Sequence, residues 1–572
     1  MRRPSIYTQT FDPLHDLHEG TCASGPSVDV AEVFQLVAWI RNISRNDFGG
    51  GGVVPFWYHH NFLPIASNAI EEASQMIHVL GFCQKRIWEV VKYSHDGEMD
   101  LVPLMHALEH LPQLSHKGHE SCTSGFCEDA SKNFTSVTQL HKCLNPGYCV
   151  TTTSNMFKES HLLEALKGNM MITAWRLDGK SLVAQDMSYL AVSHVWSDGT
   201  GAGAWKAGQV NKCLWDFFVD KARHLGCNGV WWDTVCIPKD KATRSIALNN
   251  MHHNYAAAKY TIVHDLYLAG IEWKSDGSPC IALVLSPWFT RGWTALELLL
   301  SKKVFILFRQ GDGYTLKDLD QEVLAQHQFL QSHAHWIATY AVKCLRHASD
   351  TFESTNDLLS VLRARHTSWN RDQSIIAGLM CGLTDHVTLS EQEVTKKILL
   401  KLGNIEPGGL LHGLPTMFEP QFSWCPPRFV DIPSSSASPD PIEVLPDGTL
   451  DGLWEIWCIS KTHVDKGTIR SLSTDLYVRS QVQRALVKPE ECVILTQPSF
   501  DSQGLLVKLK VGKLSKPGPG DRVYCKYIGG VNVTPSEIRR DRRRIFRHVV
   551  IGYQPGMVDV GAVDWEHEIL RQ

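Results

Sequence analysis

The fold class is decided by Tyr189-Leu-Ala-Val-Ser-His-Val-Trp196, a short and almost continuously apolar stretch. Such a run indicates a strand buried on both faces, as the strands of a parallel sheet are. A second stretch, Gly229-Val-Trp-Trp-Asp-Thr-Val-Cys-Ile-Pro238, has the same character and stops at its proline. We expect further strands at residues 261–266 and 303–308.

Helical patterns separate these strands. Apolar residues recur at helical spacing over residues 209–224 and 244–260. Strands that alternate with helices predict an α/β domain, a parallel sheet with helices on both faces. Ligands of such sheets bind at the carboxyl ends of the strands, where Ser193, His194 and Asp233 are predicted to lie.

One carboxylate stands in an unusual context, Ser286-Pro-Trp-Phe-Thr-Arg-Gly-Trp-Thr-Ala-Leu-Glu297. The segment reads as a loop that leads into a helix, with Glu297 at the edge of an apolar stripe. Glu297 is therefore either solvated or directed into a cleft, and a cleft of this kind is where catalytic carboxylates are found. We predict that the Arg291/Glu297 junction converges with the polar strand ends on one rim of the sheet.

Cysteine and histidine gather in one polar segment. The spacing is His116-x2-His119-x2-Cys122-x4-Cys127, followed by His141-x-Cys143-x5-Cys149. The segment has few apolar residues, so a tetrahedral ion would supply folding energy that a core cannot. We predict a structural zinc site, with candidate ligands His119, Cys122, Cys127, His141 and Cys149. The alternative is a loop without metal. Isolated cysteines such as Cys213 are expected to act as small apolar residues.

Composition excludes several classes of protein. The chain has 572 residues, 43% apolar and 20% charged, and a net charge of −4, which describes a globular protein with no nucleic-acid partner. The N-terminal sequence lacks the apolar core of a secretory signal, and no segment reads as a membrane span. We therefore expect a cytoplasmic location and reduced thiols.

The chain also divides by composition. The predicted parts are an N-terminal helical region (1–115), a Cys/His-rich segment (116–160), the α/β domain (185–310), a helical extension (311–430), a linker (431–450) and a small C-terminal antiparallel β domain (451–572).

Four blocks of this chain resemble the fungal heterokaryon incompatibility (HET) domain. They are residues 189–196, residues 231–237, the helical pattern from Arg244 through Met251 to Tyr255, and residues 287–297. The chain departs from the usual family pattern at His194, Pro238 and Leu296, whereas Glu297 is retained.

This resemblance implies a role in fungal non-self recognition and programmed cell death, a form of innate immunity. It also implies likeness to Toll/interleukin-1 receptor (TIR) domains, some of which cleave NAD between nicotinamide and ribose. Two alternatives follow. In the first, the domain is an NAD glycohydrolase (NAD+ nucleosidase) with NAD as substrate and Glu297 as the catalytic residue; Trp293 or Trp196 would stack on a ring of NAD, and Arg291 would hold its pyrophosphate. In the second, the domain is a non-catalytic module that signals by self-association or by binding another protein.

Overall fold

The computed structural model describes most of the chain from residue 63 onward. The described residues are 63–91, 101–109, 111, 119, 121–128, 137–153, 155–201, 209–325, 333–346, 352, 354–384, 386–433, 440–497, 500, 502–510, 522–534 and 545–552. The predicted linker is described only at its two ends, and the first 62 residues lie outside this part.

A six-stranded sheet forms the centre of the α/β domain, and its inner four strands are parallel. In order across the sheet, the strands are β1 (Trp175–Arg176), β3 (Gly229–Trp231), β2 (Tyr189–His194), β4 (Tyr260–His264), β5 (Val304–Gln310) and β6 (Gly313–Asp318). The two outermost strands run antiparallel to their neighbours. The predicted parallel α/β sheet is therefore present, and it extends beyond residues 185–310 at both ends.

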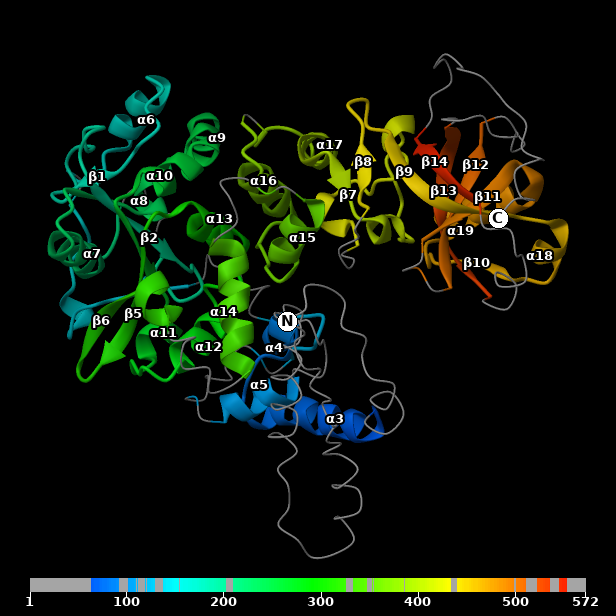
Figure 1. Cartoon of the computed structure of the whole chain (residues 1–572). Coiled ribbons are helices and arrows are strands. Elements are labelled where there is room, and N and C mark those ends of the chain that lie inside the picture. Colours follow the sequence, from blue (N-terminus) through cyan, green and yellow to red (C-terminus); the bar gives the residue numbers. More distant parts are fainter. Residues whose placement is uncertain are drawn as a thin grey trace, which may run out of the picture.

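Helices cover both faces of this sheet (Figure 1). Helix α7 packs on β2 and β3, and α13 packs on β2 from the other side. Every residue of β2 is buried, as its continuous apolar sequence predicts. The helices of this domain are α6 (Glu159–Lys167), α7 (Lys212–His224), α8 (Asp233–Cys236), α9 (Lys241–Asn249), α10 (Met251–Ala257), α11 (Leu266–Gly270), α12 (Ser278–Leu285) and α13 (Gly292–Leu300).

Two elements differ from the sequence prediction. The strand expected over residues 229–238 ends at Trp231, because the chain turns at Asp233 into the short helix α8. Trp232 is the extended N-cap residue of that helix, and the carboxylate of Asp233 in its first turn is favourable at a helix N-terminus. The helix expected over residues 244–260 is divided at Asn250 into α9 and α10.

Helices from both sides of the sequence pack beside the sheet. The N-terminal helices α4 and α5 contact α14, and α16 contacts α13. In Figure 1 the α15–α17 group lies between the α/β domain and the C-terminal strands. The bounds are α3 (Leu63–Val79), α4 (Gln84–Val91), α5 (Leu101–Leu108), α14 (His333–Arg346), α15 (Thr355–Arg363), α16 (Asn370–Met380) and α17 (Glu391–Leu402).

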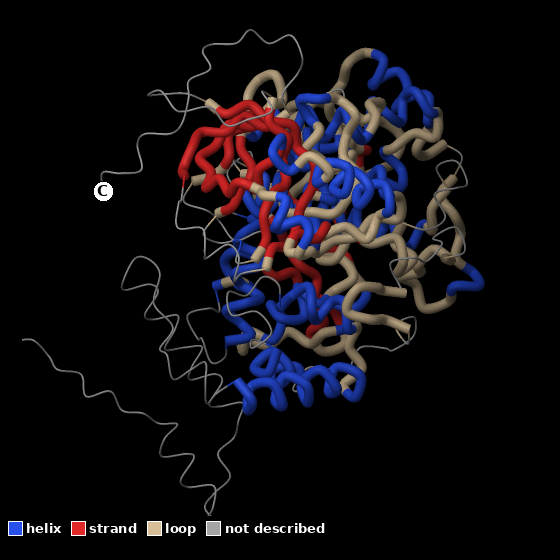
Figure 2. The backbone as a smooth tube through the Cα atoms, turned by 90° about the vertical axis from the view of Figure 1, so that its right-hand side faces the viewer, coloured by secondary structure: helices blue, strands red, loops and turns tan. Residues whose placement is uncertain are grey.

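The C-terminal region is a closed barrel of five strands, which corrects the expected antiparallel β domain. Each strand pairs with the next in the order β9, β11, β12, β13, β14, and β14 pairs back with β9. The β13–β14 pair is parallel, whereas the other pairs of the ring are antiparallel. Figure 1 shows its strands apart from the six-stranded sheet, and Figure 2 views the molecule from the barrel side.

Short strands and helix α19 flank the barrel. The predicted pairing of residues 505–511 with 522–528 is confirmed as β12 with β13, although the turn expected near residue 518 lies outside the described residues. The elements here are β7 (Asn404–Ile405), β8 (Ile442–Val444), β9 (Leu450–Cys458), α18 (Lys461–Asp465), β10 (Ile469–Ser471), α19 (Leu476–Leu486), β11 (Cys492–Thr496), β12 (Gln503–Leu509), β13 (Val523–Val533) and β14 (Ile545–Ile551).

Candidate functional site at the carboxyl edge of the sheet

The strand order creates a topological switch point at the carboxyl edge of the sheet. After β2 the chain moves to β3 on one side and then returns to β4 on the other. The connection after β2 and the connection after β4 therefore run in opposite directions, and open α/β sheets bind ligands outside the strand ends at such a switch. Ser193 and His194 are the last two residues of β2. Successive residues of a strand face opposite sides, so these two side chains begin two different clusters.

The first cluster holds Glu297. The Ser193 hydroxyl donates a hydrogen bond to Oε2 of Glu297, which lies on α13. The indole Nε1–H of Trp288 donates to Ser193 Oγ at 2.6 Å. Tyr255 lies beside the same carboxyl group and donates its hydroxyl to the carbonyl oxygen of Val192 at 3.2 Å. Glu297 is thus enclosed at the end of β2 by aromatic and hydroxyl side chains, with only 5% of its surface exposed.

Burial controls the ionisation of Glu297. Loss of hydration raises the pKa of its carboxyl group to about 7, although the Ser193 hydroxyl and the nearby His194 oppose that rise. Near neutral pH, both the carboxylic acid and the carboxylate are therefore populated. A carboxyl group tuned in this way is typical of catalytic sites, and it also occurs in buried structural networks.

The second cluster is built on His194 and Asp233. Their atoms Nε2 and Oδ1 are 2.7 Å apart, and the Trp196 indole donates to the other oxygen of Asp233 at 3.0 Å. The Trp232 indole also approaches Nε2 of His194, at 3.1 Å. One nitrogen cannot both donate to Asp233 and accept from Trp232. The shorter, charge-assisted contact with Asp233 decides the assignment, and His194 is the cation of an ion pair.

Electrostatics agrees with this assignment. Burial alone would lower the pKa of His194, but the Asp233 carboxylate raises it to about 9. Burial opposes ionisation of Asp233 as well, yet His194 and the Trp196 indole keep the pKa of that carboxyl below its usual value. The edge of the sheet therefore carries an imidazolium–carboxylate pair close to the Glu297 carboxyl group.

A glycine allows the chain to pass over this pair. A Cβ atom at Gly201 would lie 2.6 Å from Cδ2 of Trp196 and 2.8 Å from Cε1 of His194. Any larger residue would therefore displace the rings. The next residues, 202–208, lie outside the described part of the chain.

Arg291 and Trp293 lie elsewhere. The indole of Trp293 donates to Asp372 of α16 at 2.9 Å, and burial raises the pKa of that aspartate while Arg291 lowers it. Arg291 precedes α13, and its carbonyl oxygen accepts a hydrogen bond from Arg365 at 3.2 Å. These two residues connect the α/β domain to the helical extension.

Sequence reasoning missed two members of the Glu297 cluster, Trp288 and Tyr255. Both stand in the sequence blocks discussed above, but their apolar context favoured the core. Asp265, also at a strand end, accepts hydrogen bonds from the backbone N–H groups of Tyr267 and Leu268 and begins α11.

The predicted zinc ligands do not meet at one point. The structure places His119, Cys122 and Cys127 in one group and His141 and Cys149 in another. Each group is completed by cysteines outside the predicted set. Both groups could hold a metal ion.

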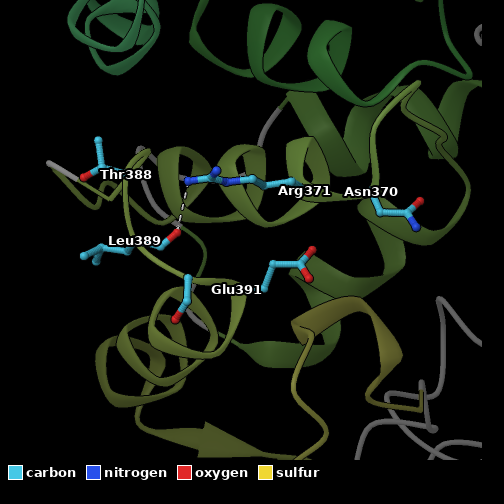
Figure 3. A pocket seen from close by; sticks show the side chains of 6 residues that line it. Asn370, Arg371, Thr388, Leu389 and Glu391 are labelled. Atoms are coloured by element: carbon cyan, nitrogen blue, oxygen red, sulfur yellow. Dashed lines mark hydrogen bonds between the residues drawn. The ribbon is translucent and has the colours of Figure 1, made fainter. Parts of the chain in front are cut away.

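A surface pocket lies away from these clusters, at the start of α16 and of α17 (Figure 3). The guanidinium of Arg371 donates to the carbonyl oxygen of Leu389 at 3.3 Å, the dashed line in Figure 3, and to that of Val387 at 2.7 Å. This pocket contains no residue of the carboxyl edge.

Comparison with known proteins finds similarity to heterokaryon incompatibility proteins. The family model described as "Heterokaryon incompatibility protein (HET)" matches residues 189–267. Vegetative incompatibility protein HET-E-1 of Podospora anserina is 25% identical over 225 residues, which is 37% of this chain. The match covers 16% of the length of HET-E-1. No solved structure matches the chain. None of the described helices combines the length and apolar character needed to cross a bilayer.

Proposed function

We propose that this HET-domain protein acts in heterokaryon incompatibility by cleaving NAD at the carboxyl edge of its sheet. The observation that carries the proposal is the position of Glu297, a buried carboxyl group at the topological switch point with a pKa of about 7. We further propose a TIR-like domain. The parallel order β3-β2-β4-β5 and a glutamate on the helix before β5 support that likeness.

The chemistry suits a lone carboxylate. In NAD the bond from ribose C1′ to the nicotinamide nitrogen breaks, and the electron pair leaves with nicotinamide, which becomes neutral. The ribose becomes oxocarbenium-like, and a fixed carboxylate stabilises that positive charge. Water then adds to C1′ and releases a proton, giving ADP-ribose. Glu297 would stabilise the cation, Ser193 would orient Glu297, and the Trp196 indole offers a surface on which a planar ring can stack.

A second function is favoured by the burial of Glu297. Its hydrogen bond to Ser193 already satisfies one carboxyl oxygen within the protein. A network of this kind can stabilise a domain whose output is self-association or binding of a partner, without turnover. The two functions differ in what Glu297 does.

Nicotinamide release separates them. Purified full-length protein is incubated with NAD at several protein concentrations, and products are resolved by chromatography. Glu297→Gln, which keeps the shape of the side chain, should lower turnover by about 100-fold or more. Glu272→Gln is the matched control, because Glu272 is a half-exposed surface residue paired with Arg309 at 2.9 Å.

The outcomes are distinct. Turnover by the wild type that is lost only in Glu297→Gln supports the enzyme. Absence of turnover at every concentration, together with self-association that Glu297→Gln leaves intact in sedimentation, supports the non-catalytic module.

A further inference from the structure

The first Cys/His cluster joins residues that are far apart in the sequence. Cys83, just before α4, meets His119, Cys122 and Cys127, and their ligand atoms all lie within 4.8 Å of one another. The two sulfur atoms of Cys83 and Cys127 are 3.7 Å apart. Nδ1 of His119 is 3.3 Å from the sulfur of Cys122 and 3.7 Å from that of Cys127.

The second cluster repeats this composition. His141, Cys143 and Cys149 meet Cys213, the second residue of α7, with all ligand atoms again within 4.8 Å. Nδ1 of His141 lies 3.9 Å from the sulfur of Cys143 and 3.8 Å from that of Cys213. Each cluster therefore offers three sulfur atoms and one imidazole nitrogen.

These distances match a tetrahedron around one ion. With Zn–S bonds of about 2.3 Å and Zn–N bonds of about 2.0 Å, the ligand atoms of a tetrahedral site stand about 3.5–3.8 Å apart. Three soft sulfur ligands with one imidazole select zinc over calcium or magnesium. We propose that this chain binds two structural zinc ions, one at Cys83/His119/Cys122/Cys127 and one at His141/Cys143/Cys149/Cys213.

Disulfide bonds describe the clusters less well. Bonded sulfur atoms are about 2.05 Å apart, far closer than the 3.7 Å between Cys83 and Cys127. The cysteines of both clusters are free thiols. Three cysteines per cluster would also leave one without a disulfide partner, whereas a tetrahedral ion uses all three.

Backbone amides support the sulfur atoms. The N–H of Glu128 donates to the sulfur of Cys122 at 3.3 Å, and the N–H of Lys142 donates to that of Cys213 at 3.2 Å. Hydrogen bonds from outside the ligand set stabilise negative charge on a metal-bound thiolate. Each cluster has at least one such bond among the described residues.

The two ions would connect one polar segment to two different helices, α4 and α7. The first joins residues 119–128 to α4, where Lys85 also donates to the carbonyl oxygen of Gly125 at 3.2 Å, and α4 packs on α12 and α14. The second joins residues 141–149 to α7. A segment with little core of its own would thus be held at both ends.

The second ion would also stand close to the carboxyl edge. Leu140, beside its ligand His141, donates its N–H to the carbonyl oxygen of Gly199 at 3.0 Å. The ammonium group of Lys142 lies 4.8 Å from the centre of the Phe217 ring on α7. Residues 140–142, which this ion would hold in place, therefore pack beside the chain that follows β2. This inference does not depend on NAD cleavage.

Metal content tests the proposal directly. Full-length protein is purified in reducing buffer and desalted in the presence of a weak chelator. Its zinc content is then measured by inductively coupled plasma mass spectrometry. We expect two zinc ions per chain, one in each of the Cys83→Ser and Cys213→Ser variants, and none in the double variant. Cys458→Ser should retain two, because that cysteine is exposed and lies outside both clusters.

A second measurement uses only the wild type, so it does not depend on whether the variants fold. X-ray absorption at the zinc edge should show an average of three sulfur and one nitrogen ligand. Less than about one ion in five chains after zinc is supplied during refolding, or a first shell dominated by oxygen, would overturn the proposal. If the wild type holds only one zinc ion per chain, the serine variant that still holds one identifies the cluster that does not bind zinc.

Discussion

The carboxyl edge of the sheet and the paired Cys/His clusters are both groups of reactive side chains, but their surroundings give them opposite energetics. Ser193, His194 and Glu297 lie in a dense apolar layer, where ionisation of Glu297 costs free energy. The Cys/His clusters lie in a segment with few apolar residues, where ligand binding would supply free energy. We therefore expect the buried carboxyl group of Glu297 to reduce the free energy of unfolding. The Cys/His ligands, once they bind metal, should increase it.

Metal removal should give the largest effect. Structural zinc contributes about 10–16 kcal/mol in small zinc-dependent domains, and part of that is expected here because other contacts remain. Chelation should lower the thermal midpoint by on the order of 10 °C and expose residues 137–149 to hydrogen exchange. The Cys83/Cys213 double serine variant is the control, since a chelator should not shift it further. An unchanged wild-type midpoint would remove the contrast between the two regions.

Breaking the ion pair at the carboxyl edge should come next. Asp233→Asn leaves His194 buried without its carboxylate, and we expect a loss of about 3 kcal/mol near pH 6. The pKa of His194 is raised to about 9, so the pair's contribution is complete below pH 6.5 and disappears as pH rises through 9. Urea unfolding at pH 6 and pH 9.5 measures the difference.

The control for that variant is Asp216→Asn. Asp216 pairs with Lys212 on the exposed surface of α7, so its loss should change stability by less than about 0.5 kcal/mol. Equal effects of the two variants, or a larger Asp233→Asn effect at pH 9.5 than at pH 6, would contradict the assignment of a buried ion pair.

A methyl group at Gly201 should have a smaller effect. Its Cβ would overlap the rings of Trp196 and His194, and overpacking of this kind costs about 1–3 kcal/mol. Gly270→Ala is matched, because a Cβ there has nothing within 4 Å. Thermal unfolding of both variants decides whether the chain after β2 is as tightly packed as the structure indicates.

Glu297→Gln should give the smallest effect, with the opposite sign. The pKa of Glu297 is raised from 4.5 to about 7, so the wild type loses stability as pH rises through that range. The rise in pKa corresponds to roughly 3 kcal/mol at pH 8, but the amide accepts the Ser193 hydrogen bond more weakly than a carboxylate does. We therefore expect a net gain of about 1 kcal/mol at pH 8 and almost none at pH 4. Unfolding at these two pH values gives the comparison, and a destabilised variant at pH 8 would show that Glu297 is a structural anion.

Local patterns predicted the sheet but not the ends of its elements. The continuous apolar character of residues 189–194 is enough to indicate a buried parallel strand, and β2 is that strand. At Asp233 the same apolar character continues beyond Trp231, yet the chain turns into the short helix α8. Sequence periodicity does not show where a buried apolar run changes from strand to helix.

Distance along the chain explains the residues that were missed. Cys83 is 44 positions from Cys127, and Cys213 is 72 positions from His141. Each stands alone among apolar neighbours, so its local sequence indicates a core residue. Only the fold brings each to the Cys/His segment. Arg291 and Trp293 lie at and just after the start of α13, and the local sequence does not show that this end of the helix meets α16.

The last strand of the barrel has a consequence for the behaviour of shortened chains. Strand β14 is hydrogen-bonded to β9 on one side and β13 on the other. A protein cut before residue 545 would leave both of those long strands with rows of unpaired backbone groups, which recruit strands from other molecules. Fragments made for crystallisation or in vitro assays should retain β14, since those without it are expected to aggregate.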